Sequence, residues 1–344
     1  MKKQLLFLIL IINFGYSQNS QDLIFKLKED LKLKKNTAEK ILYKTLLAVD
    51  DISKADDKKA NNILKSVYPI LSNQNNDSLT GLYYRILYHI NNSQLNSNEA
   101  LKSIEKSIFY YNKAKNYKNT ALSTMNKGNI FLYKGDNINA SKIYLKALSI
   151  AQTHGILKAE GLINKNLGVV FMNQEKFDDA LLYSKKAVDI FKNLGDLKEY
   201  SGALINLGNC YYNKYDAKNA LKYYQNAMTI STAINDSVNV GKLLNNIGTI
   251  YIEDKKDTVI GLNYLLKSLD IKTKINDKND IIFEYNNLAQ IYVNKKKYAD
   301  AVPFLDKSLE MSNKNGNLME IKEVYKIYSN LYLNKKESLM SDKK

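Results

Sequence analysis

Small and aromatic residues recur along the chain at steps of about 40 residues. The small residue is Gly128, Gly168, Gly208, Gly248 and then Ala289, so the steps are 40, 40, 40 and 41. Each of these is followed three positions later by an aromatic residue and preceded two positions earlier by an asparagine. A constant period of this length predicts a repeat protein in which each repeat is one structural unit.

Each regular repeat carries two more small residues, which are Ala140 and Ala147, Ala180 and Ala187, and Ala220 and Ala227. Their spacing places them on one helical face, where small side chains let neighbouring helices approach closely. With only 2 Pro and 14 Gly in 344 residues, few residues interrupt helices. The pattern predicts an all-α solenoid of antiparallel helix pairs, with turns at Gly135-Asp136, Gly195-Asp196, Tyr215-Asp216 and Asn235-Asp236.

We expect this array to occupy residues 37–334, as about seven repeats and a final unpaired helix, Met319 to Asn334, that caps the last repeat. A lone helix over residues 18–36 is expected to cap the first repeat. A polar tail, residues 335–344, follows the array. Pro303 is expected in the first turn of a second helix, where its missing N–H costs little.

The first residues have the form of a secretory signal. Two lysines precede an apolar run from Leu5 to Phe14, and the small residues Gly15 and Ser17 precede Gln18. We therefore predict a signal peptide, residues 1–17, cleaved after Ser17, and export to the periplasm or the medium. The apolar run is about half the ~20 residues that a spanning helix needs, and no second long apolar run follows, so no membrane span is expected after cleavage. An uncleaved anchor is the alternative.

The repeat pattern resembles the tetratricopeptide repeat over about residues 37–334. The best copies are Asn166-Leu167-Gly168, Asn206-Leu207-Gly208, Asn246-Ile247-Gly248 and Asn287-Leu288-Ala289. The period exceeds the usual 34 residues and the closing proline is missing. Both departures are similar to the longer repeats of kinesin light chains and of exported sensor regions ahead of bacterial histidine kinases or helix-turn-helix regulators. The resemblance implies a right-handed superhelix whose first helices line a concave groove for peptides or partner helices.

Asparagines at constant places in the first helices are the candidate ligand contacts that this resemblance implies. One row is Asn126, Asn166, Asn206, Asn246 and Asn287, and neighbouring positions add Asn129, Asn209, Asn173, Asn213 and Tyr212. An amide offers both a donor and an acceptor, so a row of amides can pair with the backbone of an extended peptide. The alternative is that asparagine is structural here, in a chain rich in asparagine throughout. No basic clamp for a terminal carboxylate is recognisable, so an internal peptide segment or a folded partner is expected.

The formal charge of +16 does not indicate a nucleic-acid partner. Arg85 is the only arginine among 51 basic residues, and arginine is the residue that phosphate and base recognition favours. Scattered lysines are instead typical of a solvated surface. Cys210 is the only cysteine, so it cannot form an intramolecular disulfide, and it lies on a face predicted to be buried.

Catalytic and metal-binding patterns are missing from the sequence. The only histidines are His89 and His154, and neither belongs to a recognisable triad, ligand set or phosphate loop. We therefore expect no enzyme activity, no catalytic residues, no metal site and no cofactor.

Two functions remain open at this point. The first is a non-catalytic scaffold or adaptor in the bacterial cell envelope that binds a protein or extended peptide along the groove. The alternative is a ligand-sensing module whose kinase or regulator is separate or lost. Three segments, Asp77-Ser78-Leu79, Asp236-Ser237-Val238 and Asp257-Thr258-Val259, also resemble a bacterial O-glycosylation motif, although helix capping explains them more simply. The sequence identifies neither the partner nor the oligomeric state.

Overall fold

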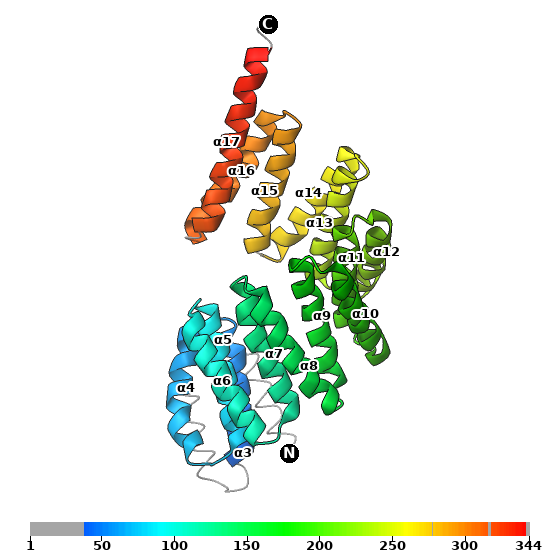
Figure 1. Cartoon of the computed structure of the whole chain (residues 1–344). Coiled ribbons are helices and arrows are strands. Elements are labelled where there is room, and N and C mark those ends of the chain that lie inside the picture. Colours follow the sequence, from blue (N-terminus) through cyan, green and yellow to red (C-terminus); the bar gives the residue numbers. More distant parts are fainter. Residues whose placement is uncertain (1–37, 277, 316–317, 342–344) are drawn as a thin grey trace. The chain divides into compact units, whose positions relative to one another are not determined.

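The computed structural model describes residues 38–276, 278–315 and 318–341, and these form fifteen helices and no strand (Figure 1). The chain divides into two compact units, Met1–Val170 and Phe171–Lys344. The predicted signal peptide, residues 1–17, and capping helix, residues 18–36, lie outside the described residues. In chain order the helices make seven consecutive pairs followed by α17, as the repeat pattern predicts.

The described residues of the first unit contain six complete helices. They are α3 (Ala38–Ser53), α4 (Asp57–Ser72), α5 (Asp77–Ser93), α6 (Ser97–Lys113), α7 (Tyr117–Tyr133) and α8 (Asn137–Thr153). Consecutive helices from α3 to α8 pack side by side, and α3 also contacts α5 (Figure 1). α9 (Leu157–Asn173) contains the boundary between the units. The main core of this unit is rich in Leu, Ile and Val from α3, α4 and α5, with the ring of Tyr111 buried beside them.

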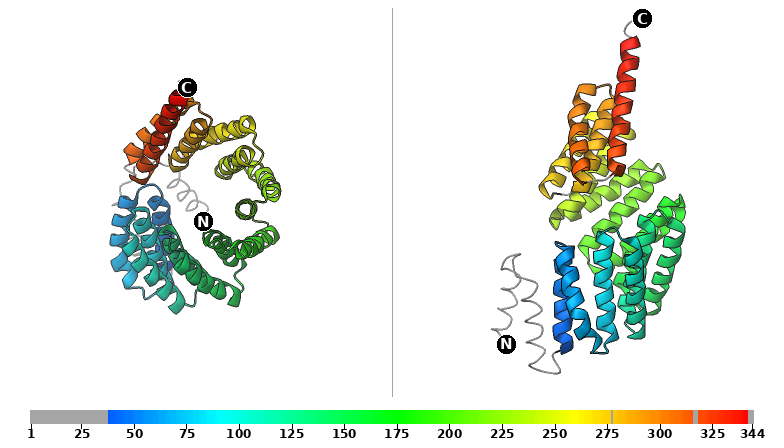
Figure 2. Two further views of the ribbon diagram at one scale, coloured as in Figure 1. Left: turned by 45° about the horizontal axis from the view of Figure 1, so that its top comes forward. Right: turned by 90° about the vertical axis from the view of Figure 1, so that its left-hand side faces the viewer.

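The second unit continues with eight helices. They are α10 (Phe177–Leu194), α11 (Leu197–Asn213), α12 (Ala217–Ala233), α13 (Ser237–Glu253), α14 (Thr258–Lys274), α15 (Lys278–Asn294), α16 (Tyr298–Asn315) and α17 (Leu318–Ser341). Each packs on the next, and α17 contacts both α15 and α16. In Figure 1 and in the right-hand view of Figure 2, α17 continues past the ends of α15 and α16.

Turns recur every 20 residues, because a residue with left-handed backbone follows each helix from α4 to α15. Positive φ angles occur at Asn75, Leu95, Lys115, Gly135, Gly155, Glu175, Gly195, Tyr215 and Asn235, and then at Lys256, Asn276 and Lys296 after the one-residue insertion. An Asp or Asn side chain often follows and caps the next helix, as Asp136 does by accepting from the backbone N–H of Asn139 at 3.0 Å. This half-period fixes the helix length and confirms the four predicted turns.

The predicted small residues lie in the interior of the helix array. Ala140, Ala147, Ala180, Ala187, Ala220 and Ala227 are all fully buried. Asp236 and Asp257 cap α13 and α14 by accepting hydrogen bonds from backbone N–H groups, which confirms the capping interpretation of two of the three Asp-Ser/Thr segments. Asp77 instead lies inside α5, whose cap is Asn76.

Two local expectations differ from the structure. Residues 335–341, expected as part of a polar tail, continue α17, because no Pro or Gly interrupts them. Pro303 lies in the second turn of α16 rather than in its first. Pro69 lies inside α4, and the helix continues three residues beyond it to Ser72.

Candidate functional site

The predicted asparagines lie on the partly exposed face of the first helices. In α11 this face consists of Gly202, Asn206, Asn209 and Asn213, while most positions between them are buried. The equivalent asparagines are Asn126 and Asn129 on α7, Asn166 and Asn173 on α9, Asn246 on α13 and Asn287 on α15. We call those in the first unit (Asn126, Asn129, Asn166) and those in the second (Asn173, Asn206, Asn209, Asn213, Asn246, Asn287) the amide rows of their units. Asn173 and Asn213 are exposed and the other seven are half-buried.

In the first unit, two side chains from two helices donate to one amide oxygen on a third helix. Oδ1 of Asn129 accepts a hydrogen bond from the hydroxyl of Tyr144 at 2.6 Å and another from Nδ2 of Asn166 at 3.2 Å. Tyr144 comes from α8 and is fully buried apart from this contact. Burial raises the pKa of the Tyr144 hydroxyl above its usual value, so the hydroxyl stays protonated as a donor.

The second unit repeats this arrangement with residues 80 positions later. Oδ1 of Asn209 accepts from the hydroxyl of Tyr224 at 2.6 Å and from Nδ2 of Asn246 at 3.1 Å. Burial likewise raises the pKa of the Tyr224 hydroxyl. We call each set an Asn-Tyr-Asn triad. The structure therefore brings four of the predicted ligand residues into contact with one another, in two pairs.

Each triad fixes which end of each amide is used inside the protein. Asn129 and Asn209 use their oxygens twice, which leaves the Nδ2 groups without a hydrogen bond to the described residues. Asn166 and Asn246 use their nitrogens as donors, which leaves their oxygens as acceptors. One donor and one acceptor, held side by side, are what the C=O and N–H of an extended peptide require.

The remaining predicted contacts are less uniform. Asn126 and Asn287 make no side-chain hydrogen bond with other described residues, and Asn206 is engaged with a neighbour while half-buried. Nδ2 of Asn213 donates to the backbone oxygen of Asn209 at 2.9 Å and to the sulfur of Met172 at 3.3 Å. The hydroxyl of Tyr212 donates to Glu253, so this residue is tied to the next repeat.

Few charges interrupt the amide row of the second unit, although the chain carries +16 overall. On the same face of α13, only Lys242 and Glu253 are charged, and Glu253 accepts from Tyr212. Amides, which both donate and accept hydrogen bonds, are therefore the main polar groups of this face.

Glycine explains why the tyrosines reach the amides. A Cβ atom on Gly128 would lie 2.5 Å from a ring carbon of Tyr144, and one on Gly208 would lie 2.5 Å from the same atom of Tyr224. The ring therefore needs a glycine beneath it. Neither tyrosine was predicted from the sequence, although a signal was present. A Gly-Asn pair with a Tyr sixteen residues after the Gly occurs at Gly128 and at Gly208. The repeats that start from Gly168 and Gly248 lack this combination.

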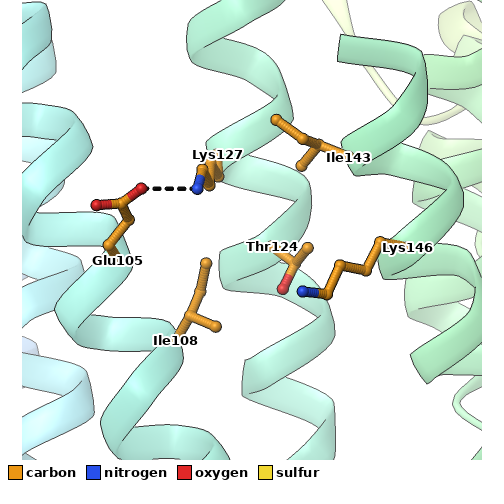
Figure 3. Close-up of a pocket in the computed structure, with 6 residues that line it drawn as sticks. All are labelled: Glu105, Ile108, Thr124, Lys127, Ile143 and Lys146. Carbon is orange, nitrogen blue, oxygen red and sulfur yellow. Dashed lines mark hydrogen bonds and ion pairs between the residues drawn. The ribbon is translucent and has the colours of Figure 1, made fainter. Parts of the chain in front are cut away.

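A separate hollow in the first unit lies between α6 and α8, over α7 (Figure 3). Its volume is about 230 Å³, and its lining is Glu105, Ile108, Thr124, Lys127, Ile143 and Lys146. Glu105 and Lys127 form an ion pair at 2.7 Å across one side. The hollow was not predicted. In four later repeats the position equivalent to Ile143 carries an aromatic ring that stacks on a ring of the first helix, at Tyr183, Tyr223, Tyr264 and Phe304. The aliphatic residue at position 143 was therefore the sequence signal for this hollow.

The described residues hold no group of three or more metal-ligating side chains. The ring of His154 stacks on Tyr117 at 3.6 Å between centroids, at the end of α8. Burial raises the pKa of the Cys210 thiol, which lies 3.4 Å from the hydroxyl of Ser184. His154 and Cys210 thus each pack against a neighbouring side chain. In the part of the chain that the structure describes, every helix is too short or too polar to cross a membrane.

Two segments, residues 123–154 and 285–315, match the tetratricopeptide repeat family. No curated protein matches the sequence significantly. Among solved structures, the apo form of RapI is 12% identical, with a TM-score of 0.58 over 92% of this chain and 99% of that one. A Rap protein complexed with competence and sporulation factor is 15% identical, with a TM-score of 0.57 over 93% and 99%. A signal transduction ATPase with a tetratricopeptide repeat sensor from Pyrococcus horikoshii is 18% identical, with a TM-score of 0.56 over 75% and 43%.

These similarities make the chain an all-α repeat protein of the tetratricopeptide type. At such low identities, the likeness to the solved structures shows the fold alone. Repeats of this type generally form scaffolds for protein interactions.

Proposed function

We propose that this protein is a non-catalytic scaffold or adaptor that binds an extended peptide segment of a protein partner on its amide rows. The observation that carries the proposal is the pair of Asn-Tyr-Asn triads, in which a buried tyrosine holds two amides in fixed orientations. Each triad offers one donor and one acceptor to a peptide backbone. Because the amides are already oriented, the protein loses little side-chain entropy when a ligand binds to them.

The proposal predicts a partner recognised by its backbone rather than by its charge. Nucleic acid is a poor candidate, since neutralising phosphates requires clustered basic residues and the amide row of the second unit has almost none. Binding should change little between about 50 mM and 200 mM salt, whereas phosphate-dominated binding falls by orders of magnitude over that range.

An isosteric substitution separates the ligand contact from the internal contact. Asn129→Asp and Asn209→Asp keep the oxygen that accepts from the tyrosine, but they replace the outward amino group with an oxygen. We expect the double variant to keep its melting temperature within a few degrees and to lose binding to arrayed extended peptides by about tenfold, which is ~1.4 kcal/mol. Asn226→Asp, on the exposed face of α12, is the matched charge control.

Equal peptide binding by the wild type, the double variant and the control would exclude the triads as the contact. Strong salt dependence of all binding would show that the lysines capture the peptides non-specifically.

Export to the cell envelope is part of the same proposal and rests on residues 1–17. The mature protein, recovered from an envelope or medium fraction of the producing bacterium, should begin at Gln18. An intact mass that includes residues 1–17 would contradict cleavage and favour the anchored alternative.

A second candidate function is ligand sensing, and two comparisons favour it. One similar structure is complexed with competence and sporulation factor, and another carries a tetratricopeptide repeat sensor. In that case the amide rows would hold a signalling ligand and pass its binding to a separate kinase or regulator. Cross-linked capture from the producing cells distinguishes the two, because recovery of a kinase or a transcription regulator supports sensing and recovery of other envelope proteins supports the scaffold.

A further inference from the structure

The same helical face is buried in α15 and exposed in α17. On α15, Ile282, Ala289 and Val293 are at most 1% exposed, and Ala289 and Val293 share a core with residues of α16. The residues forty positions later on α17 are Lys322, Ser329 and Leu333. Lys322 and Ser329 are exposed and Leu333 is 58% exposed. Among the described residues, α17 therefore presents a face to solvent that first helices elsewhere bury under their second helix.

An aromatic stacking row reaches α17 and stops there. In four successive repeats the first-helix ring stacks on a second-helix ring, with centroids 5.3 to 5.7 Å apart, in the pairs Phe171–Tyr183, Tyr211–Tyr223, Tyr251–Tyr264 and Tyr292–Phe304. Tyr332 is the next member of this row and is 62% exposed. No ring of a second helix stacks on it in the described part of the chain. The row thus leaves one place for an aromatic side chain.

Tyr332 is also held in position before any partner arrives. Its ring stacks on Tyr328 at 6.2 Å between centroids. The hydroxyl of Tyr328 donates to Asp306 of α16, and burial raises the pKa of that hydroxyl, so it remains a donor. A ring fixed in this way loses little conformational entropy on binding.

Charge decides between possible occupants of this face. Lys322, Tyr325, Ser329, Tyr332 and Lys336 follow one another at steps of three and four residues, so they form one stripe, with Leu333 beside it. We call these six residues the α17 stripe. Lys322 and Lys336 at its ends are exposed, and neither forms an ion pair with a described residue. In an antiparallel pair of α17 helices centred on Ser329, these lysines would meet, and the net charge of +16 adds repulsion between two copies.

We propose that the α17 stripe docks an amphipathic helix of a partner protein, which supplies an aromatic side chain to stack on Tyr332 and acidic residues to meet Lys322 and Lys336. The partner helix continues the array as an eighth second helix. This surface lies on a different face from the amide rows, so it does not depend on the proposed function.

The test uses the full-length protein and a fluorescein-labelled peptide with the sequence of α16 (Tyr298–Asn315), the helix that covers the equivalent face of α15. We expect weak binding in fluorescence anisotropy, weakened about tenfold by Tyr332→Ala with Leu333→Ala, and weakened similarly by Lys322→Glu with Lys336→Glu. A peptide carrying Phe304→Ala should bind about tenfold less well. Tyr215→Ala, at a turn residue that is 93% exposed, is the matched control and should bind like the wild type.

Equal binding by the wild type and the Tyr332, Leu333 variant overturns the proposal, and so does the absence of measurable binding to the wild type. Sedimentation equilibrium tests whether a second copy of the protein occupies this face instead. If the wild type is a dimer and the variant with Tyr332→Ala and Leu333→Ala is a monomer, the face binds a second copy and the proposal of a partner helix is wrong. The changed residues are exposed, so unaltered melting of each variant shows that the array is intact.

Discussion

Repeat five (α11 and α12) and repeat six (α13 and α14) share the repeat spacing but fill the space between their helices differently. In repeat five, Gly208 lies under the ring of Tyr224. In repeat six, Gly248 faces Gly261, and a Cβ on Gly248 would lie 2.9 Å from the carbonyl oxygen of Gly261. Glycine therefore makes room for an aromatic ring in one repeat and for a close backbone approach in the next.

One position near the end of the second helix differs even more between these two repeats. Ser231 of repeat five is fully buried and bonds to the hydroxyl of Ser201 at 2.6 Å. The equivalent position in repeat six is Lys272, whose Nζ lies 2.6 Å from an oxygen of Glu284 on α15. Lys272 is 3% exposed and Glu284 is 0% exposed. The repeat spacing thus fixes where helices lie, while the chemistry between them varies from one junction to the next.

The largest effect should come from breaking the buried ion pair. Lys272→Met leaves the Glu284 carboxylate in the core without its cation, and we expect the free energy of unfolding to fall by about 3–5 kcal/mol. Burial already raises the pKa of Glu284, its Oε1 has no partner among the described residues, and apart from Lys272 only Ser268 favours the charged carboxylate. Urea denaturation of the full chain, followed by circular dichroism, measures the change.

The matched control replaces both charges with apolar residues. Lys272→Met with Glu284→Leu copies the apolar choice at Leu243 of the preceding junction, and we expect stability within ~1 kcal/mol of the wild type or above it. If the double variant is as unstable as Lys272→Met alone, packing rather than charge holds this junction.

The next effect tests the two uses of glycine. Gly208→Ala drives a methyl group into the Tyr224 ring, and an overpacking cost of about 1–3 kcal/mol should exceed the ~1 kcal/mol that alanine gains in helix propensity. Adding Tyr224→Leu, which copies Leu265 of repeat six, should remove much of the clash, so the two changes should couple in a double-mutant cycle. Strictly additive effects would mean that the ring does not occupy the space above Gly208.

Gly248→Ala is the counterpart in repeat six. Its methyl group meets the backbone oxygen of Gly261, which no side-chain substitution can move. We expect Leu265→Ala to leave most of this cost in place, in contrast to the rescue in repeat five. If the second substitution restores stability equally in both repeats, Gly248 is limited by a side chain, as Gly208 is, and not by the backbone of Gly261.

A smaller effect tests the triad that repeat five has and repeat six lacks. Tyr224→Phe removes the hydroxyl that donates to Asn209, and we expect a loss of about 1 kcal/mol. Tyr144→Phe should cost about the same in the first unit. Peptide binding should also fall, because only the hydrogen bond from Asn246 then orients the Asn209 amide. Unchanged stability and binding would show that the triads do not orient the amides.

Much of the fold was predictable because its signals are local and periodic. The small residues that mark each helix face, such as Gly208, Ala220 and Ala227, lie within one repeat, and their spacing alone gives the helix pairs. The 20-residue turns were only partly predictable, since Leu95 and Lys115 adopt left-handed backbone that their residue types do not favour.

The candidate site was predictable as a row of residues but not as a hydrogen-bond network. Asn209 meets partners 15 and 37 residues away, and those distances depend on how three helices pack. The buried pair of Lys272 and Glu284 was missed for a related reason. In a chain of scattered lysines, one buried lysine looks like any solvated one until the junction is known.

The smallest effect concerns the turns, which repeats five and six share. Tyr215 (φ 60) and Lys256 (φ 56) are left-handed residues that carry a Cβ, and each is strained by roughly 1–2 kcal/mol relative to glycine. Tyr215→Gly and Lys256→Gly should each stabilise by about 0.5–1 kcal/mol, because glycine's greater freedom in the unfolded chain offsets part of the relief. Gly135→Ala, the reverse change in repeat three, should destabilise by a similar amount. If urea denaturation shows equal gains in the free energy of unfolding for both variants, the two repeats differ only in their cores. If only one variant gains stability, the two repeats also differ in their turns.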